Sequence, residues 1–177
     1  YKDYLTWDDG QRWELIEGVP YNMTPAPLRE HQKISVVMTI QIGNYLNDKK
    51  CELYAAPFDV CLPLESETDE DITTVVQPDL SIICSQKKLT KEGCKGAPDL
   101  IVEIISPSTA SKDIKEKFIL YEKHGVKEYW IVFPGDRIIE IYYLKKKKYG
   151  PPLHFTFDDN ITGMLFKDMT ICLKEIS

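Results

Sequence analysis

Two short stretches of this chain are apolar on both faces of a strand, and each has an acidic residue inside its apolar run. Residues 75–84 read VVQPDLSIIC, and residues 98–106 read PDLIVEIIS. A strand that is apolar on both faces is typical of a central position in a sheet that is covered on both sides. Asp79 and Glu103 therefore enter the interior, where a carboxylate is costly unless it is paired, hydrogen-bonded or bound to a cation.

Two amphipathic helices can supply the covering layers. Hydrophobic residues at spacings of three and four predict a helix over about 30–48, and the same periodicity predicts a second helix near 109–124. Ser108 or Thr109 can cap the start of the second helix, and Gly125 can end it.

The remaining segments predict strands and loops around this centre. EYWIVF is a further buried strand, and RIIEIYYL, which follows a Pro-Gly-Asp turn, is expected to pair with it as a hairpin, whereas KKLTKEGCKGA is expected to be a loop. The predicted fold is α/β, or α+β: a mixed central sheet flanked by the two helices, with extra strands near both ends. A length of 177 residues favours one domain over residues 1–177.

Composition narrows the class of protein. No apolar run approaches the roughly 18 residues of a membrane span, and the opening residues have no apolar signal region, so we expect no membrane partner. The net charge of −6 argues against indiscriminate coating of DNA but allows a local basic face. Five cysteines form no C-x-x-C pair, which favours reduced thiols in a cytoplasm; they are Cys51, Cys61, Cys84, Cys94 and Cys172.

The alternation of side chains along a strand suggests where the two acids point. Glu103 shares one face of its strand with Ile101, and Asp79 lies on the preceding strand. If these strands are neighbours, the carboxylates converge and provide the hard oxygen ligands that suit Mg²⁺ or Mn²⁺. The alternative for Asp79 alone is an aspartate that caps a loop or pairs with an arginine.

The chain also resembles a known family. The blocks MTPAPLREHQKIS, APFDVCLP, VVQPDLSIIC, GAPDLIVEIISPST and YEKHGVKEYWIVFP are similar to the Uma-type family of restriction endonucleases, within the PD-(D/E)xK phosphodiesterase superfamily. The likeness covers about residues 5 to 150. It implies a restriction-endonuclease-like fold, Mg²⁺- or Mn²⁺-dependent hydrolysis of DNA, and a metal site formed by Asp79, Glu103 and the backbone carbonyl of Ile104.

One position departs from the superfamily pattern. Ile105 occupies the place where many of these nucleases have lysine, and the resemblance implies that this family moves the lysine to the next helix. The candidates there are Lys112, Lys115 and Lys117. We expect Lys117 to be the catalytic lysine. It lies at the edge between core and solvent, from which its ammonium can extend to within about 6 Å of Glu103. The alternative is an ordinary surface pair with Asp113.

Three further features are candidates for roles in the site. His31 begins the first helix and can touch a phosphate or a metal-bound water, or it can be a structural histidine. Glu14 can supply another acid beside the metal, or it can be a solvated or strand-pairing residue. The basic run at 145–148 can contact DNA phosphates, or it can be a solvated turn.

These features predict a cytoplasmic, metal-dependent endonuclease that acts on DNA. A homodimer is expected, because twofold symmetry pairs two sites for cutting both strands, with the hairpin at 137–144 as the contact surface. The alternative is a nucleic-acid-binding or protein-interaction module that retains the fold without catalysis, and Ile105 and the acidic net charge favour it.

Overall fold

The computed structural model describes residues 1–7, 10–23, 28–64, 67–68, 70–106, 112–174 and 176, and of residues 112 and 113 only the backbone. Its larger sheet has seven strands in the order β11-β10-β9-β8-β6-β3, with β12 paired to β10. These are β3 (Glu52–Ala55), β6 (Leu80–Ile83), β8 (Leu100–Ile104), β9 (Glu128–Phe133), β10 (Ile138–Lys145), β11 (Lys148–Tyr149) and β12 (Leu153–Thr156). The sheet is mixed, because β8 and β9 are parallel whereas the other pairs are antiparallel.

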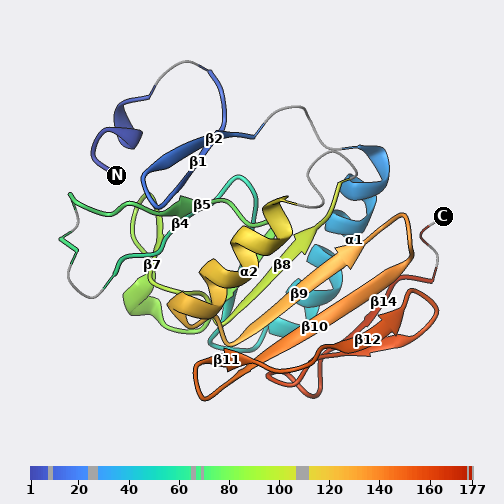
Figure 1. Ribbon diagram of the computed structural model, residues 1–177. Coiled ribbons are helices and arrows are strands. Elements are labelled where there is room, and N and C mark those ends of the chain that lie inside the picture. The colour runs from blue at the N-terminus through green and yellow to red at the C-terminus, as the bar shows by residue number, and fades with distance from the viewer. Residues whose placement is uncertain are drawn as a thin grey trace.

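The two predicted helices cover opposite faces of this sheet. They are α1 (Arg29–Leu46) and α2 (Lys112–His124), and Figure 1 shows α2 in front of the central strands and α1 behind them. Val102 of β8 packs in the cluster that includes the buried residues of α1, whereas its neighbour Ile101 packs in the cluster of α2. The expected mixed sheet between two helices is therefore confirmed, and Glu103 points to the α2 face.

A second sheet of five strands was not expected. Its order is β2-β1-β5-β4-β7, and its strands are β1 (Trp13–Ile16), β2 (Val19–Asn22), β4 (Asp59–Cys61), β5 (Val75–Val76) and β7 (Gly93–Lys95). β7 lies in the segment predicted as a loop, after a short 3₁₀ helix at Gln86–Lys88. Near the C-terminus, β13 (Asn160–Thr162) and β14 (Thr170–Cys172) form a separate pair, as the expected extra strands.

The prediction of one continuous strand over 75–84 is wrong. The chain leaves the smaller sheet after Val76 and enters the larger one at Leu80, with Asp79 in the bend between them. Pro78 explains the interruption, because proline has no N–H to donate to a strand ladder. Asp79 therefore precedes β6 instead of lying within it, and it sits where the two sheets meet.

Helix α2 ends as the sequence predicts. Gly125 has φ +84°, and the N–H of Val126 donates to the carbonyl of Tyr121 at 3.0 Å. This is a Schellman ending, in which glycine adopts the left-handed conformation without a Cβ penalty. The predicted caps at Ser108 and Thr109 lie outside the described residues. None of the described helices is long and apolar enough to cross a membrane.

The expectation of five reduced thiols is wrong for one pair. Cys51 and Cys84 form a disulfide across the ends of β3 and β6. The antiparallel register that pairs Glu52 with Ile83 places the next two residues opposite each other. A sequence separation of 33 residues gives no sign of this contact. Cys61, Cys94 and Cys172 remain free.

The start of β8 is held by Asp99. Its carboxylate accepts hydrogen bonds from the Cys84 N–H at 2.8 Å and from the Lys127 ammonium at 2.6 Å. Burial alone would raise the pKa of Asp99, but these two donors outweigh burial and lower it below its ordinary value of 3.8. A carboxyl group whose pKa is lower in the folded state stabilises the fold at a pH above its unfolded-state pKa. This stabilisation is lost as the pH falls through the folded-state pKa.

We therefore predict that Asp99→Asn lowers the free energy of unfolding by about 1–3 kcal/mol at pH 7. The difference between wild type and variant should shrink as the pH falls below 3.8, where the unfolded chain begins to bind a proton at Asp99, until the pH passes the lower pKa of the folded state. Urea unfolding at pH 7 and at pH 3 measures both values. An unchanged difference at the two pH values would contradict the proposed ion pair.

Candidate active site

Lys117 is the centre of a buried charge cluster. Its ammonium lies 3.0 Å from Oε1 of Glu103 and 2.9 Å from Oε1 of Glu14, and the residue is only 7% exposed. The expected proximity to Glu103 is confirmed. The alternative of a surface pair is wrong because the lysine is buried, and the side chain of Asp113 lies outside the described part of the chain.

Tyr121 completes the contacts to Glu103. Its hydroxyl donates to Oε1 of Glu103 at 2.6 Å, so that the lysine and the tyrosine both contact the same carboxylate oxygen. Tyr121 was expected only as part of the buried stripe of its helix. Its position four residues after Lys117 is the sequence signal that could have found it, because residues at this spacing share a helix face.

Glu14 reaches the cluster from the smaller sheet. Its Oε1 also accepts a hydrogen bond from the backbone N–H of Gln77 at 2.8 Å, and Glu14 is 3% exposed. The side chain of Gln77 is held in turn by the guanidinium of Arg12 and by Asp59. Glu14 is therefore a buried, fixed partner of Lys117, and its interpretation as a solvated residue is wrong.

Asp79 is held by a backbone donor and a histidine. Its Oδ2 accepts a hydrogen bond from the Ile104 N–H at 2.7 Å and lies 3.2 Å from Nε2 of His31. Burial would lower the pKa of His31, but the hydrogen bond and charge of Asp79, with smaller contributions from Glu103 and the Ile104 backbone, raise it. The Nδ1 atom of His31 is buried and has no hydrogen-bond partner among the described residues.

The pKa values within the cluster follow from burial and charge. Burial raises the pKa of Glu103, although the Lys117 ammonium opposes this, and repulsion from Asp79 and Glu14 adds to the increase. Burial would lower the pKa of Lys117, but the carboxylates of Glu103 and Glu14 outweigh it and raise that pKa. The lysine therefore carries a permanent positive charge.

Asp79 and Glu103 each bring a carboxylate with two oxygens to the candidate metal site. The contacts that hold them use Oδ2 of Asp79 and Oε1 of Glu103. Glu103 and Glu14 both contact one ammonium, and the charge of Asp79 also acts on Glu103, which leaves an excess of negative charge. Hard oxygen donors with excess negative charge fit a divalent cation.

The donor set is small. Among the described residues, no group of three or more His, Cys, Asp and Glu side chains is arranged to hold a metal ion. Two carboxylates, the backbone carbonyl of Ile104 and solvent are then the available ligands, which is the arrangement that Mg²⁺ accepts.

Lys115 and the basic run at 145–148 do not join the cluster. Lys115 is exposed, and the side chain of Lys112 lies outside the described residues. The run 145–148 forms the exposed turn between β10 and β11, in which Lys148 pairs with Glu122 at 2.6 Å. These contacts agree with the interpretation of this run as a solvated turn.

Comparisons with known proteins agree with the architecture. The sequence matches the Uma2 family, described as "Putative restriction endonuclease", over residues 1–173. An uncharacterized protein of Synechocystis sp. is 28% identical over 145 residues, covering 80% of this chain and 72% of that protein. A crystal structure of "a putative nuclease belonging to DUF820" from Anabaena variabilis has a similar fold, with a TM-score of 0.76 and 17% identity, covering 98% of this chain and 94% of the other.

Proposed function

Because this chain belongs to the Uma2 family, whose description is "Putative restriction endonuclease", we propose that it hydrolyses DNA phosphodiester bonds with the help of Mg²⁺ or Mn²⁺. The observation that carries the proposal is the buried Lys117 ammonium beside Glu103. It supplies from α2 the positive charge that Ile105 cannot supply from the strand position.

The residues of the cluster have separate roles in this proposal. Asp79, Glu103 and the Ile104 carbonyl hold the cation, which supplies positive charge to the scissile phosphate and activates the attacking water when it is bound. Lys117 stabilises the negative charge that develops on the phosphate. Glu14 fixes the lysine, and His31 lies beside Asp79, where it can donate to a phosphate oxygen.

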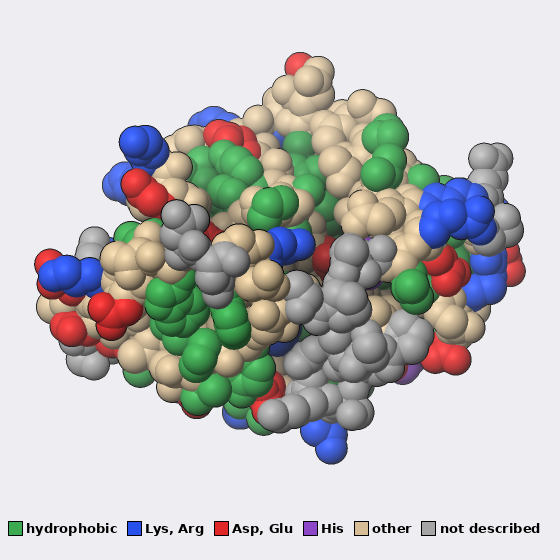
Figure 2. Space-filling model, turned by 90° about the horizontal axis from the view of Figure 1, so that it is seen from above, with side chains coloured by type: hydrophobic (Ala, Val, Ile, Leu, Met, Phe, Trp, Pro, Cys, Tyr) green, Lys and Arg blue, Asp and Glu red, His purple; other side chains and the backbone are tan. Residues whose placement is uncertain are grey.

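The surface charge is compatible with a cation-dependent reaction. Figure 2 shows acidic and basic side chains together on the face seen from above, with hydrophobic patches between them. With a net charge of −6, the chain repels DNA at long range. A divalent cation in the site offsets this repulsion where the phosphate must approach the acids.

The test is nicking of supercoiled plasmid by purified protein. We expect nicking with Mg²⁺ or Mn²⁺ and none with EDTA. Asp79→Ala should be inactive, because it removes one of the two carboxylates proposed to hold the cation. Equal nicking by wild type and Asp79→Ala would indicate a contaminant. Absence of nicking by wild type, together with retained DNA binding, would favour a binding module that keeps the fold without catalysis.

Tyr121 is a positioning residue in this proposal. Tyr121→Phe removes the hydroxyl that donates to Glu103 at 2.6 Å, so Glu103 should present its other oxygen to the cation less rigidly. We expect the Mg²⁺ concentration for half-maximal nicking to rise about three- to tenfold, because residues that hydrogen-bond to metal ligands tune the affinity for the metal. The nicking rate at saturating Mg²⁺ should change less. An unchanged Mg²⁺ dependence would leave Tyr121 with a packing role only.

The homodimer and its contact surface on the hairpin at 137–144 stay predictions. Ile139 and Ile141 of β10 are 0% and 1% exposed, because they pack into the core of their own chain. A contact surface on this hairpin would therefore have to use its partly exposed apolar side chains, such as Ile138, Tyr143 and Leu144.

A further inference from the structure

A pocket lies next to His31 at one end of the larger sheet. It has a volume of about 200 Å³. Strands β8 and β9 are parallel, so their carboxyl ends meet at the same edge, and the residues that follow them line the pocket with the first turn of α1. Ligands of open α/β sheets commonly bind at the carboxyl ends of strands.

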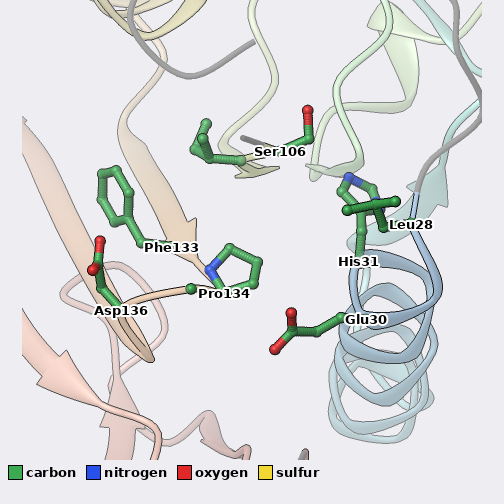
Figure 3. A pocket seen from close by; sticks show the side chains of 9 residues that line it. Leu28, Glu30, His31, Ser106, Phe133, Pro134 and Asp136 are labelled. Carbon is green, nitrogen blue, oxygen red and sulfur yellow. The ribbon is translucent and has the colours of Figure 1, made fainter. Parts of the chain in front are cut away.

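The walls of the pocket combine apolar surfaces with two carboxylates. Figure 3 shows Leu28, Glu30 and His31 on the side of α1, facing Phe133, Pro134 and Asp136 on the side of β9. Ile105 and Ser106 complete the lining. An aromatic ring and aliphatic side chains suit the faces of a flat apolar group, and the carboxylates suit hydrogen-bond donors on its edge.

This chemistry excludes two other kinds of occupant. Glu30 and Asp136 would repel a phosphate group. They also suit a hydrated cation poorly, because most of the remaining lining residues are apolar and offer it no oxygen ligands. The occupant is therefore a neutral, flat group with donors on its edge.

The pocket adjoins the proposed active site through His31. His31 lines the pocket, and its Nε2 lies 3.2 Å from Oδ2 of Asp79. Ile105 and Ser106 directly follow Ile104, whose N–H donates to the same carboxylate oxygen. A group bound in the pocket therefore lies close to the bond that would be cut beside Asp79.

We propose that the pocket binds the nucleobase of an unpaired nucleotide next to the phosphodiester bond that is cut, a proposal that rests on the nuclease function. The amino group of cytosine, adenine or guanine donates to Asp136 or Glu30, in the way that acidic side chains accept from cytosine N4. Thymine has no exocyclic amino group. A base must leave its stack to enter such a pocket, so the substrate is single-stranded or locally opened DNA.

The experiment titrates the ¹⁵N-labelled protein with deoxycytidine and with thymidine in EDTA, so that the result does not depend on catalysis. We expect deoxycytidine to shift the amide signals of the pocket residues and thymidine to bind about fivefold more weakly or worse. Asp136→Asn or Glu30→Gln should reduce this preference. Asp48→Asn is the matched control, because Asp48 is an exposed acid just beyond the other end of α1.

The outcomes separate this proposal from the nuclease function. Equal affinity for both nucleosides, no binding, or shifts confined to residues outside the pocket would overturn the nucleobase pocket, whether or not plasmid nicking is observed. Selective deoxycytidine binding at the pocket would support it even for a chain without nicking activity, in which case only the proposed hydrolysis fails. Faster cleavage of a DNA hairpin with a cytosine loop than of one with a thymine loop would show that the pocket selects the substrate of the nuclease reaction.

Discussion

Replacing Lys117 with methionine is expected to reduce DNA cleavage by about 100-fold or more, because it removes the positive charge beside the reacting phosphate. It should also destabilise the protein by about 3–5 kcal/mol, since Glu103 and Glu14 would be left buried without their shared cation. Cleavage rates measured well below the melting temperature, together with urea unfolding, give the two effects separately.

Two further variants distinguish chemistry from folding. Lys115→Met removes a lysine from an exposed position of the same helix and should change neither cleavage nor stability. Lys117→Met combined with Glu14→Gln should recover part of the stability, because one buried charge is neutralised, while cleavage stays low. Wild-type cleavage by a folded Lys117→Met protein would remove the lysine from the mechanism.

The second large effect concerns the C-terminal segment. Glu128 is 0% exposed, and its carboxylate accepts hydrogen bonds from the indole N–H of Trp130 and from the backbone N–H groups of Met164 and Leu165. A Cβ at Gly163 would lie 2.0 Å from Oε1 of Glu128. Gly163→Ala should therefore lower the free energy of unfolding by about 3 kcal/mol, which is at the upper end of the usual cost of inserting a methyl group into a packed core.

Gly150→Ala is the control for this prediction. A Cβ at Gly150 would meet no heavy atom within 4 Å, and the residue does not need a left-handed backbone. We expect Gly150→Ala to change the free energy of unfolding by no more than about 0.5 kcal/mol. Thermal melting of both variants gives the comparison, and equal melting temperatures would show that the carboxylate of Glu128 can move aside.

Local sequence patterns predicted the elements that have strong periodicity. The apolar spacing of α1 and α2 reflects burial against one layer, and β8, which is apolar on both of its alternating faces, reflects burial between two layers. A single segment encodes each of these patterns by itself. The same alternation placed Glu103 on the face that receives Lys117. These features therefore required no knowledge of distant residues.

The smaller sheet could not be predicted in this way. β5 and β7 have two and three residues, so neither gives a periodic signal, and each is defined by partners far away in the sequence. The Cys51–Cys84 disulfide and the contact between Glu14 and Lys117 have the same origin, since 33 and 103 residues separate the partners. Long-range pairing, and not local propensity, decides these features.

The bend at Asp79 links catalysis to the order of folding. Glu14 belongs to the smaller sheet and Glu103 to the larger one, and the ammonium of Lys117 contacts both. A nascent or partly unfolded chain that has formed one sheet alone lacks the complete charge cluster. Such a chain has no assembled site, so the proposed DNA-cutting activity is withheld until the whole molecule has folded.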